Sequence, residues 1–507
     1  MAKLPKDCIR IDDNTLIIQD VKVKNRIYAN TNVAIENEAV EELKELLTVA
    51  RTAKNMYAIK PEWFTCEPEV VGVSLSPDFH KGSGIPIGTS MLTRGMAVPQ
   101  SVGGDINCGV RLLALSPDFN EIKPCLDELE TVLRHIFFEG GRNIPLSQLQ
   151  RHELILNGTA NLQKETDDGI WKFFDEKQHQ VDINFTRHRG GFSVSSADGL
   201  EDYLSRKDIT RDSQIGSIGG GNHFVELQYV DRIINPSTAY AYGIKKNQLV
   251  LMIHSGSVSI GHICGTRYRD ITRQLYQETG LKFPKNEIFP LPDGVPQYNQ
   301  FWNMLHNAAN FAFANRLFMG LMFKQALSKF IPIGVKMSCI YDTPHNLAWE
   351  TTEGVLHRKG TSPAEGIDWF TALPAELQEQ SPIVGEPVLI PGSMGSSSYL
   401  MEGMGNTQAF CSASHGAGRA LSRGKALKYD ESTFEKFLRE FRIITPIDPK
   451  RHDLKGRKDI IKKYRESLKK EAPFAYKDVF PVVDTLRDAK IASPVAELRP
   501  ILTLKGS

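Results

Sequence analysis

The sequence predicts an α+β fold, with mixed β-sheets and surrounding helices in a single large domain over residues 1–507. Short apolar, β-branched runs at residues 70–75, 249–253 and 334–341 end in loops rich in glycine and polar residues, as buried strands do. Segments with helical spacing lie between these runs, but the alternation is too irregular for a Rossmann or barrel series. No linker rich in proline, serine and glycine divides the chain, which favours one compact domain over several.

Three segments have the spacing and length of helices, at residues 122–138, 298–330 and 431–441. The second is rich in methionine and phenylalanine, so a buried core helix is favoured over a cofactor-binding segment. Asn315 and Arg316 interrupt its most apolar part, and no segment approaches the roughly 18 apolar residues of a membrane span. We therefore expect no membrane partner.

The charges of the chain nearly cancel, with 61 lysines and arginines against 60 aspartates and glutamates and a formal net charge of +1. This balance excludes a protein that holds nucleic acid by bulk charge, but a local basic face would still suffice for phosphate contact. Seven scattered cysteines without a CxxC pair make a disulfide framework improbable. With no apolar run of signal-peptide length at the N-terminus, we expect a reducing cytoplasmic location.

A set of potential metal ligands lies in loops marked by glycine or proline or at the end of an apolar run. Asp105 and Cys108 are in GGDINCG, His223 is in GGGNHFVE, His254 ends a buried run, and His345 is in TPHN. Each histidine alone is more often structural, but the set suits two divalent ions that share a thiolate ligand. Ligand softness alone would accept zinc or iron as well as manganese.

A further histidine, His415, lies in SASHGAGRALSR, where Gly416 and Gly418 allow a close approach of the backbone. The following residues read as a helix, whose N-terminal N–H groups would hold a phosphate near His415. A neutral imidazole nitrogen is a competent nucleophile toward phosphorus. The upstream PGSMGSSSYL is either a second donor-rich loop or a plain surface loop.

Taken in order, these motifs resemble the RtcB-type RNA ligases, which join RNA ends with GTP and manganese. The resemblance includes PDFHKGSG around Asp78, GGDINCG, GGGNHFVE, HSGS, PHN, HRKG, PGSMG, SHGAGR, AYKD and the terminal LKG. It implies an RtcB-like fold and two Mn²⁺ ions, one held by Asp105, Cys108 and His223 and the other by Cys108, His254 and His345. It also implies that His415 is guanylylated by GTP and that Asp78 is a further active-site acid. The residues implied around the guanylate are Asn222, Glu226, Asn346, Pro391, Gly392, Ser393, Met394, Ser398, Gly416, Ala417, Gly418, Tyr476 and Lys505.

The implied activity joins RNA 2′,3′-cyclic-phosphate or 3′-phosphate ends to 5′-hydroxyl ends, in tRNA splicing or RNA repair. The partners are then RNA with those ends and GTP, and an archease-type activator assists some members of the family. The alternative is a dinuclear metal-dependent RNA phosphodiesterase or phosphatase that does not ligate. A third interpretation is a non-catalytic RNA-binding scaffold.

Three features test this resemblance. The family pattern HSGSRG(L/I)G reads HSGSVSIG here, with Val258 where arginine is expected; Arg267 or Arg269 is a candidate substitute. Lys505 lies close to the end of the chain, and a role in the site predicts that this segment docks. The basic stretch at residues 450–470 is either a solvated helix face or an electrostatic track for an RNA backbone.

Overall fold

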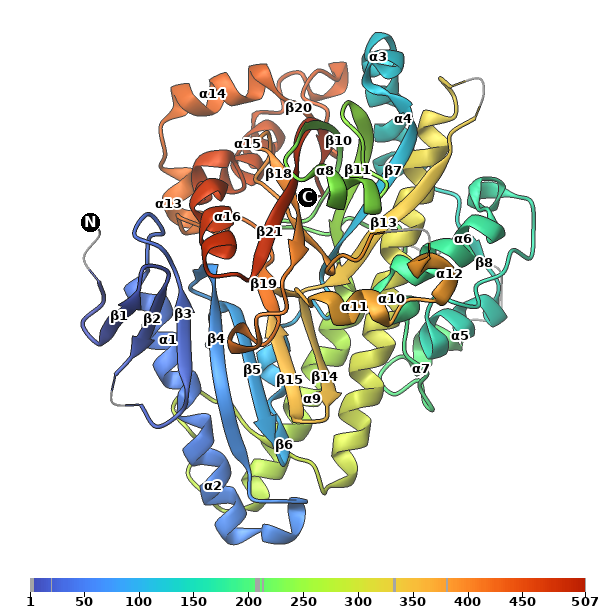
Figure 1. Ribbon diagram of the computed structural model, residues 1–507. Coiled ribbons are helices and arrows are strands. Elements are labelled where there is room, and N and C mark those ends of the chain that lie inside the picture. The colour runs from blue at the N-terminus through green and yellow to red at the C-terminus, as the bar shows by residue number, and fades with distance from the viewer. Residues whose placement is uncertain are drawn as a thin grey trace.

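Two β-sheets form the centre of the computed structural model, which describes residues 4–19, 21–205, 210–211, 214–331, 334–379 and 382–506 (Figure 1). The first has seven strands, and all neighbours are antiparallel except β3 and β4. Across the sheet they are β1 (Cys8–Asp12), β2 (Thr15–Ile18), β3 (Asn25–Tyr28), β4 (Glu69–His80), β5 (Ile87–Arg94), β15 (Gly354–Lys359) and β14 (Asn346–Thr351).

The second sheet has eight strands and carries the ends of several predicted motifs. Its order is β13 (Met337–Pro344), β7 (Gly109–Asp118), β11 (Gln248–Ser255), β10 (Phe224–Ile233), β21 (Ala492–Leu504), β18 (Ser398–Gly403) and β17 (Pro387–Ile390), with β20 (Arg442–Ile444) parallel to β21. The other pairings in this sheet are antiparallel. Three short pairs complete the strands: β6 (Met96–Ala97) with β12 (Leu291–Pro292), β16 (Thr361–Pro363) with β19 (Ser412–Ser414), and β8 (Pro145–Leu146) with β9 (Thr210–Arg211).

Helices surround both sheets (Figure 1). The longer ones are α1 (Asn37–Leu47), α2 (Val49–Ile59), α4 (Leu126–Phe138), α5 (Gln148–Asn157), α9 (Val258–Glu278), α10 (Pro296–Leu327), α14 (Glu431–Glu440), α15 (Lys458–Lys470) and α16 (Val479–Asp488). Shorter ones are α3 (Phe119–Ile122), α6 (Glu176–Asp182), α7 (Glu201–Leu204), α8 (Pro236–Ala241), α11 (Ile367–Thr371), α12 (Ala375–Gln378) and α13 (Arg423–Leu427). The predicted α+β class is confirmed.

The predicted core helix is confirmed as α10, whose side chains are buried on every face over most of its length. It packs against α4, α5, α9 and strand β11, and its phenylalanines and methionines belong to the largest hydrophobic cluster. A helix that is apolar all round is stable only when neighbours cover it on all sides, and the burial of α10 shows that its neighbours do so. Among the described helices, none combines the length and the apolar composition that crossing a bilayer requires.

Two local predictions are wrong, one for the end of strand β4 and one for the residues after His415. Strand β4 does not end near residue 75 but continues to His80, with an irregular register between Leu75 and His80 that places Asp78 in a bulged part of the strand. The residues after His415 do not form a helix; β19 ends at Ser414, and α13 begins only at Arg423 after the cap Ser422. Gly418 accounts for this difference, because its φ is +72° and a Cβ there would lie 2.1 Å from the carbonyl oxygen of Asp78.

Candidate active site

The potential metal ligands lie close together because they are at the ends of four adjacent strands, and these ends are at the same edge of the eight-stranded sheet. Cys108 directly precedes β7, His223 directly precedes β10, His254 lies near the end of β11, and His345 connects β13 to β14. The register brings their neighbours together, since His254 is opposite both Val110 and Phe224. The backbone N–H of His345 also donates to the carbonyl of Cys108 at 2.8 Å.

The structure brings all five predicted ligands into two groups that share one thiol. Asp105, Cys108 and His223 form the first group, Cys108, His254 and His345 form the second, and the ligand atoms of each group lie within 4.8 Å of one another. Cys108 Sγ lies 3.1 Å from His223 Nε2 and 3.4 Å from His254 Nε2. His254 Nε2 in turn lies 3.2 Å from His345 Nε2. Cys108 therefore belongs to both groups.

The hydrogen bonding of this cluster fits a bound cation. His223 Nδ1 lies 3.0 Å from the carbonyl of Ile218, so it carries the proton and Nε2 carries a lone pair. That Nε2 lies 2.8 Å from the carboxylate oxygen Oδ2 of Asp105. Two acceptor atoms at this distance repel each other unless a proton or a cation lies between them. Burial also lowers the pKa values of His254 and His345 well below the usual histidine value, which keeps both imidazoles neutral and able to bind a metal.

Glycine in the GGGNH loop serves the histidine rather than a phosphate. Gly219 has a φ of +84°, and a Cβ at this position would lie 2.6 Å from His223 Nδ1. Gly506 packs against the same turn, where a Cβ would lie 1.9 Å from the carbonyl oxygen of Gly219. The loop therefore holds the His223 ring by close backbone contact, and it leads into strand β10.

A buried arginine that the sequence analysis did not assign to the site holds the backbone on both sides of the cluster. Arg316 on α10 is fully buried and donates to the carbonyls of Asn107 at 2.7 Å and Ser255 at 3.0 Å. Its Nε donates to Asp342 Oδ1 at 2.8 Å, which balances the charge. Asn107 adjoins Cys108 and Ser255 adjoins His254, so one guanidinium fixes two ligand positions. The signal was a cation interrupting an apolar helix, but its partners could not be read from the sequence.

His415 is positioned by Asp78, which is fully buried in the bulge of β4. His415 Nδ1 lies 2.6 Å from Asp78 Oδ2, and Asp78 Oδ1 accepts a 2.6 Å hydrogen bond from the Ser76 hydroxyl. Burial alone would raise the pKa of Asp78, but its interactions with His415 and Ser76 lower it below its usual value. An ionised Asp78 keeps the proton of His415 on Nδ1 and leaves the lone pair on Nε2.

Two other histidine rings flank His415. The ring of His345, from the metal-ligand cluster, lies 4.9 Å from the His415 ring centre, and the ring of His80 lies 6.4 Å away in a stacked orientation. Burial lowers the pKa of His80 to about 4, so this imidazole is neutral. His80 lies in the PDFHKGSG motif, but nothing in the sequence indicated a role for it.

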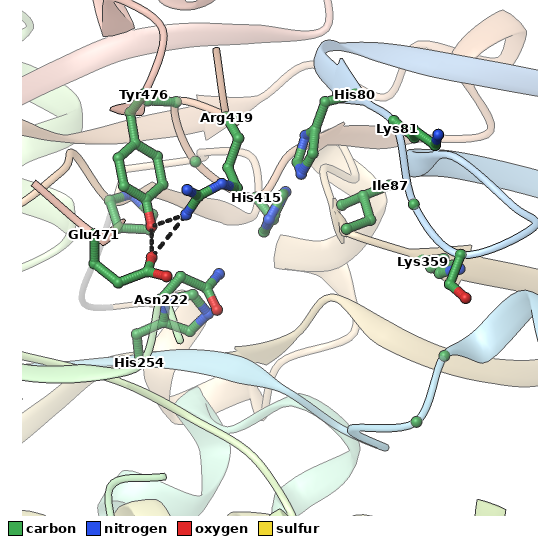
Figure 2. Close-up of a pocket in the computed structure, with 18 of the residues that line it drawn as sticks. His80, Lys81, Ile87, Asn222, His254, Lys359, His415, Arg419, Glu471 and Tyr476 are labelled. Atoms are coloured by element: carbon green, nitrogen blue, oxygen red, sulfur yellow. Dashed lines mark hydrogen bonds and ion pairs between the residues drawn. The ribbon is translucent and has the colours of Figure 1, made fainter. Parts of the chain in front are cut away.

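A cavity of about 610 Å³ opens over His415 (Figure 2). In Figure 2, Tyr476, Arg419 and Glu471 lie on one side of His415, and His80, Lys81, Ile87 and Lys359 lie on the other. Ten of the residues predicted around a nucleotide line this cavity: Asn222, Pro391, Gly392, Ser393, Met394, Gly416, Ala417, Gly418, Tyr476 and Lys505. Asn346 lines an adjoining pocket at the metal-ligand cluster.

Glu226 and Ser398 lie outside this lining, although they were predicted near the guanine. Gln228 Nε2 donates to Glu226 Oε1 at 2.7 Å and to Ser398 Oγ at 2.9 Å, and Thr503 donates to the other carboxylate oxygen of Glu226. Burial raises the pKa of Glu226 to about 7. Phe224 lines the cavity. Glu226 lies two residues further along β10 and therefore on the same face of the strand.

The carboxylate exposed to the cavity is Glu471, which the sequence analysis missed. It accepts hydrogen bonds from Arg419 at 2.9 Å, from Arg423 at 3.2 Å and from the Tyr476 hydroxyl. The Arg419 guanidinium lies 5.2 Å from the centre of the Tyr476 ring. Although burial raises the pKa of Glu471, the charge of Arg419 lowers it below its usual value, so this acid is ionised.

The predicted docking of the segment around Lys505 is confirmed. Lys505 follows the end of β21 and is buried, with Nζ donating to the carbonyls of Gly221 at 2.6 Å and His223 at 2.8 Å. Burial lowers the pKa of its amine to about 8. Lys505 thus connects the floor of the cavity to the loop that carries Asn222 and His223.

This combination of an α+β fold, a buried thiol and imidazole cluster and a carboxylate-held histidine defines a class of site suited to metal-assisted phosphoryl transfer. A family model described as tRNA-splicing ligase RtcB matches residues 63–506, and the chain therefore belongs to the RtcB family. It is 32% identical to a tRNA-splicing ligase RtcB of Methanococcus maripaludis, over 87% of this chain and 89% of that protein. It is 30% identical to a tRNA-splicing ligase RtcB of Thermococcus kodakarensis, over 96% and 95% of the two chains. An RNA-splicing ligase RtcB of Mycobacterium tuberculosis is 32% identical over 87% of this chain and 98% of its own.

Proposed function

We propose that this protein is a GTP- and Mn²⁺-dependent RNA ligase that joins 2′,3′-cyclic-phosphate or 3′-phosphate ends to 5′-hydroxyl ends. The observation that carries the proposal is the position of His415. Its ring lies 4.9 Å from that of His345, a member of the metal-ligand cluster, while Asp78 holds its Nδ1 at 2.6 Å. A histidine fixed in this tautomer at the floor of a cavity is built to attack phosphorus through Nε2.

Asp105, Cys108 and His223 would hold one Mn²⁺ ion, and Cys108, His254 and His345 would hold the other. When bound, these ions supply charge neutralisation at the phosphates and activation of an attacking oxygen. The chain itself supplies the nucleophile, its orientation by Asp78, and the donors around the nucleotide. Lys505, Asn222, Asn346 and the backbones of Gly392 and Gly416 are the proposed donors.

Glu226, Ser398 and Tyr476 are proposed to select guanine, with Pro391, Ser393, Met394, Ala417 and Gly418 completing the site. A carboxylate accepts from guanine N1–H and N2–H, which adenine does not offer. Glu471 is the carboxylate that lines the cavity, while Glu226 lies two residues after Phe224 on the same face of β10. We propose that Glu226 reaches the base and that Glu471 holds Arg419 and Tyr476 beside it.

The proposed reaction proceeds in three exchanges of a phosphorus bond after any cyclic phosphate is hydrolysed to a 3′-phosphate. His415 Nε2 attacks the α-phosphorus of GTP, a P–N bond forms, and pyrophosphate leaves. An oxygen of the RNA 3′-phosphate then attacks the same phosphorus, the P–N bond breaks, and RNA-3′-pp-5′-G is released from the histidine. Finally, the 5′-hydroxyl of the second RNA attacks the 3′-phosphorus, loses its proton, and displaces GMP.

Incubation of the metal-loaded protein with α-labelled GTP tests the proposal directly. We expect a covalent label that is lost in acid, resists alkali and requires Mn²⁺, because a P–N bond to histidine has this stability. His415→Ala abolishes the label, whereas His452→Ala, which removes an exposed histidine of a short 3-10 turn, retains it.

The same assay separates the ligase from its alternatives when one arm contains an archease-type activator. A protein that hydrolyses a 2′,3′-cyclic phosphate without forming any labelled adduct in either arm is the dinuclear phosphodiesterase. A protein that binds RNA but retains no Mn²⁺ after desalting is the non-catalytic scaffold. The proposed compartment is the cytoplasm, where the seven free thiols of the chain would remain reduced.

A further inference from the structure

The residue that departs from the family pattern, Val258, has a backbone rather than a side-chain role. It begins α9 with a φ of +51°, and its N–H donates to Asp105 Oδ1 at 3.2 Å. Its side chain lines the pocket at the metal-ligand cluster and brings no charge there. The cation expected at this position from the resemblance must come from elsewhere, or the site lacks it.

The next turns of α9 place polar side chains along the cavity. His262, Gly265, Tyr268 and Arg269 all line it, and their spacing of three, three and one residues places them on one side of the helix. Arg267 lies on another side, where it forms an ion pair with Glu201 at 3.2 Å. Of the two arginines that the sequence offered as substitutes, only Arg269 therefore faces the cavity.

Contacts through Gly103 place α9 next to Lys359, which Figure 2 shows with Lys81 on the side of His415 away from Tyr476. The Tyr268 hydroxyl donates to the carbonyl of Gly103 at 3.3 Å, and a Cβ on Gly103 would lie 3.7 Å from Cε of Lys359. His262 also lines the pocket of the metal-ligand cluster, so it stands where the two cavities meet. We call this side, defined by Lys81, Gln100, His262, Arg269 and Lys359, the α9 side.

The two sides of His415 differ in charge. On the side of Tyr476, the cations Arg419 and Arg423 are balanced by Glu471. Among the described residues that line the α9 side, none is an aspartate or a glutamate. The nearby Glu36 and Glu42 accept from backbone N–H groups of residues 81, 82 and 84 instead of lining the cavity.

Lys359 and Arg269 differ in how easily their side chains can move to contact a ligand. Lys359 is mostly buried, with Nζ donating to the carbonyl of Ile85 at 2.9 Å. Burial lowers its pKa to about 8, so the amine still carries its charge at neutral pH. Arg269 is exposed, and its bonds to Gly265 and Thr266 stay within its own helix. A guanidinium in this state can turn to a phosphate without breaking an ion pair.

We propose that the α9 side is a subsite for a backbone phosphate of the RNA strand, in which Arg269 supplies the cation that Val258 does not and His262 donates a further hydrogen bond. The subsite rests on the proposed function for its ligand class, since a polyanionic strand must lie next to the phosphate that reacts at His415. Its charge pattern favours a phosphodiester over a neutral or cationic ligand. The helix thus replaces one cation at its first residue by two donors, His262 about one turn and Arg269 about three turns further along.

The test compares two arginines of one helix. A short fluorescent single-stranded RNA with a 5′-hydroxyl and a 3′-phosphate is titrated with the full-length protein by fluorescence anisotropy over a series of KCl concentrations. We expect Arg269→Ala to weaken binding about tenfold and to reduce the slope of log K against log salt by about 0.7, the loss of one phosphate contact on a single strand. Arg267→Ala removes the same charge from another side of α9 and stays within about twofold of the unmodified protein.

Thermal unfolding of every variant is measured as well, and unchanged unfolding excludes a folding defect as the cause of weaker binding. We expect two additional variants to separate the roles of charge and hydrogen bonding: Arg269→Lys retains the charge and most of the RNA affinity, whereas His262→Gln weakens RNA binding. Equal affinities of Arg269→Ala and Arg267→Ala overturn the subsite, as does a failure of the unmodified protein to bind the RNA.

GTP labelling of His415 is measured in parallel and reports on the proposed function alone. A labelled protein in which Arg269→Ala has no effect on RNA affinity overturns the subsite and leaves the ligase proposal intact. An unlabelled protein in which Arg269→Ala weakens RNA binding supports the subsite while the guanylylation proposal fails.

Discussion

The reactive side chains of this site are each held by one partner that decides where the proton sits. Asp78 fixes the proton of His415 on Nδ1, and the carbonyl of Ile218 fixes that of His223 on Nδ1. In both residues the lone pair is therefore left on Nε2, which in His223 points at Cys108 and Asp105. The chemistry of the site follows from these tautomers as much as from the residue types.

Replacing Asp78 by asparagine tests this tautomer control. Asp78→Asn keeps the shape of the side chain but removes the charge that holds the proton on Nδ1 of His415, so we expect the rate of GTP labelling to fall about 10²- to 10⁴-fold. The measurement is the single-exponential rate of adduct formation at saturating GTP and Mn²⁺.

Ser76→Ala is the matched control, because it removes only the 2.6 Å hydrogen bond to the other carboxylate oxygen of Asp78. It should slow labelling much less than Asp78→Asn does. Adduct formation by Asp78→Asn at the rate of the unmodified protein would show that Asp78 does not position His415.

At this scale the clustering of the five potential metal ligands was predictable, because each of them is marked by glycine, by proline or by the end of an apolar run. It did not reveal Arg316, His80 or Glu471. Their roles depend on partners far away along the chain, such as Arg316 with Asn107 and Ser255. No local pattern records which distant backbone carbonyl a buried guanidinium will meet.

At the scale of elements, α10 connects the hydrophobic core to the site. It is buried on every face, and Arg316 reaches from it to the backbone beside two metal-ligand positions. Asp342 on β13 is the acidic partner of this arginine, at 2.8 Å. The same carboxylate also accepts a hydrogen bond from Arg111 on β7, at 3.1 Å. The helix was predictable from its apolar composition, whereas the use of its single buried arginine was not.

Arg316→Met and Arg111→Met separate stability from metal binding. Both remove a buried partner of Asp342, and we expect each to lower the free energy of unfolding by about 3–5 kcal/mol. Only Arg316→Met also releases Asn107 and Ser255, so only this variant should weaken Mn²⁺ binding, by about 10- to 100-fold.

Urea unfolding and calorimetric Mn²⁺ titration of the folded proteins measure the two effects. Equal Mn²⁺ affinities in Arg316→Met, Arg111→Met and the unmodified protein would remove Arg316 from the positioning of the ligands.

The basic stretch at residues 450–470 forms the predicted helix only from Lys458, as α15, with Ile460, Ile461 and Tyr464 partly buried. Part of its charge is paired, since Arg465 and Lys469 both contact Glu431 on α14. Lys462 is 77% exposed and lies only at the limit of an ion pair, 4.0 Å from Glu466. The helix ends at Lys470, next to Glu471, which lines the cavity, and an RNA track along this helix stays a prediction.

At the scale of the whole molecule, the fold class was predictable but the order of the strands was not. Strands β11 and β13 were predictable from their apolar runs. The eight-stranded sheet, however, depends on backbone pairing between residues far apart in the sequence, such as Val225 with Leu504. Pairing over such distances is decided by the packed core rather than by local propensity. The same long-range pairing brings Lys505 to the loop of His223, which joins the last strand to the site.

The net charge of +1 acquires a specific meaning in this arrangement. Six cationic side chains line the cavity, namely Lys81, Arg269, Lys359, Arg419, Arg423 and Lys505, and Glu471 is the only acid among the described residues that line it. A chain that is nearly neutral overall can thus present a local cationic surface to two phosphates.

The central claim is that guanylyl-His415 is an intermediate in RNA joining. The most direct measurement isolates the guanylylated protein, removes all GTP, and mixes it with RNA that carries a 3′-phosphate and RNA that carries a 5′-hydroxyl in a single turnover. We predict one joined RNA and one released GMP for each labelled histidine, with RNA-3′-pp-5′-G appearing first. A labelled protein that releases GMP without joining RNA, or joining by His415→Ala in the same experiment, would contradict the account.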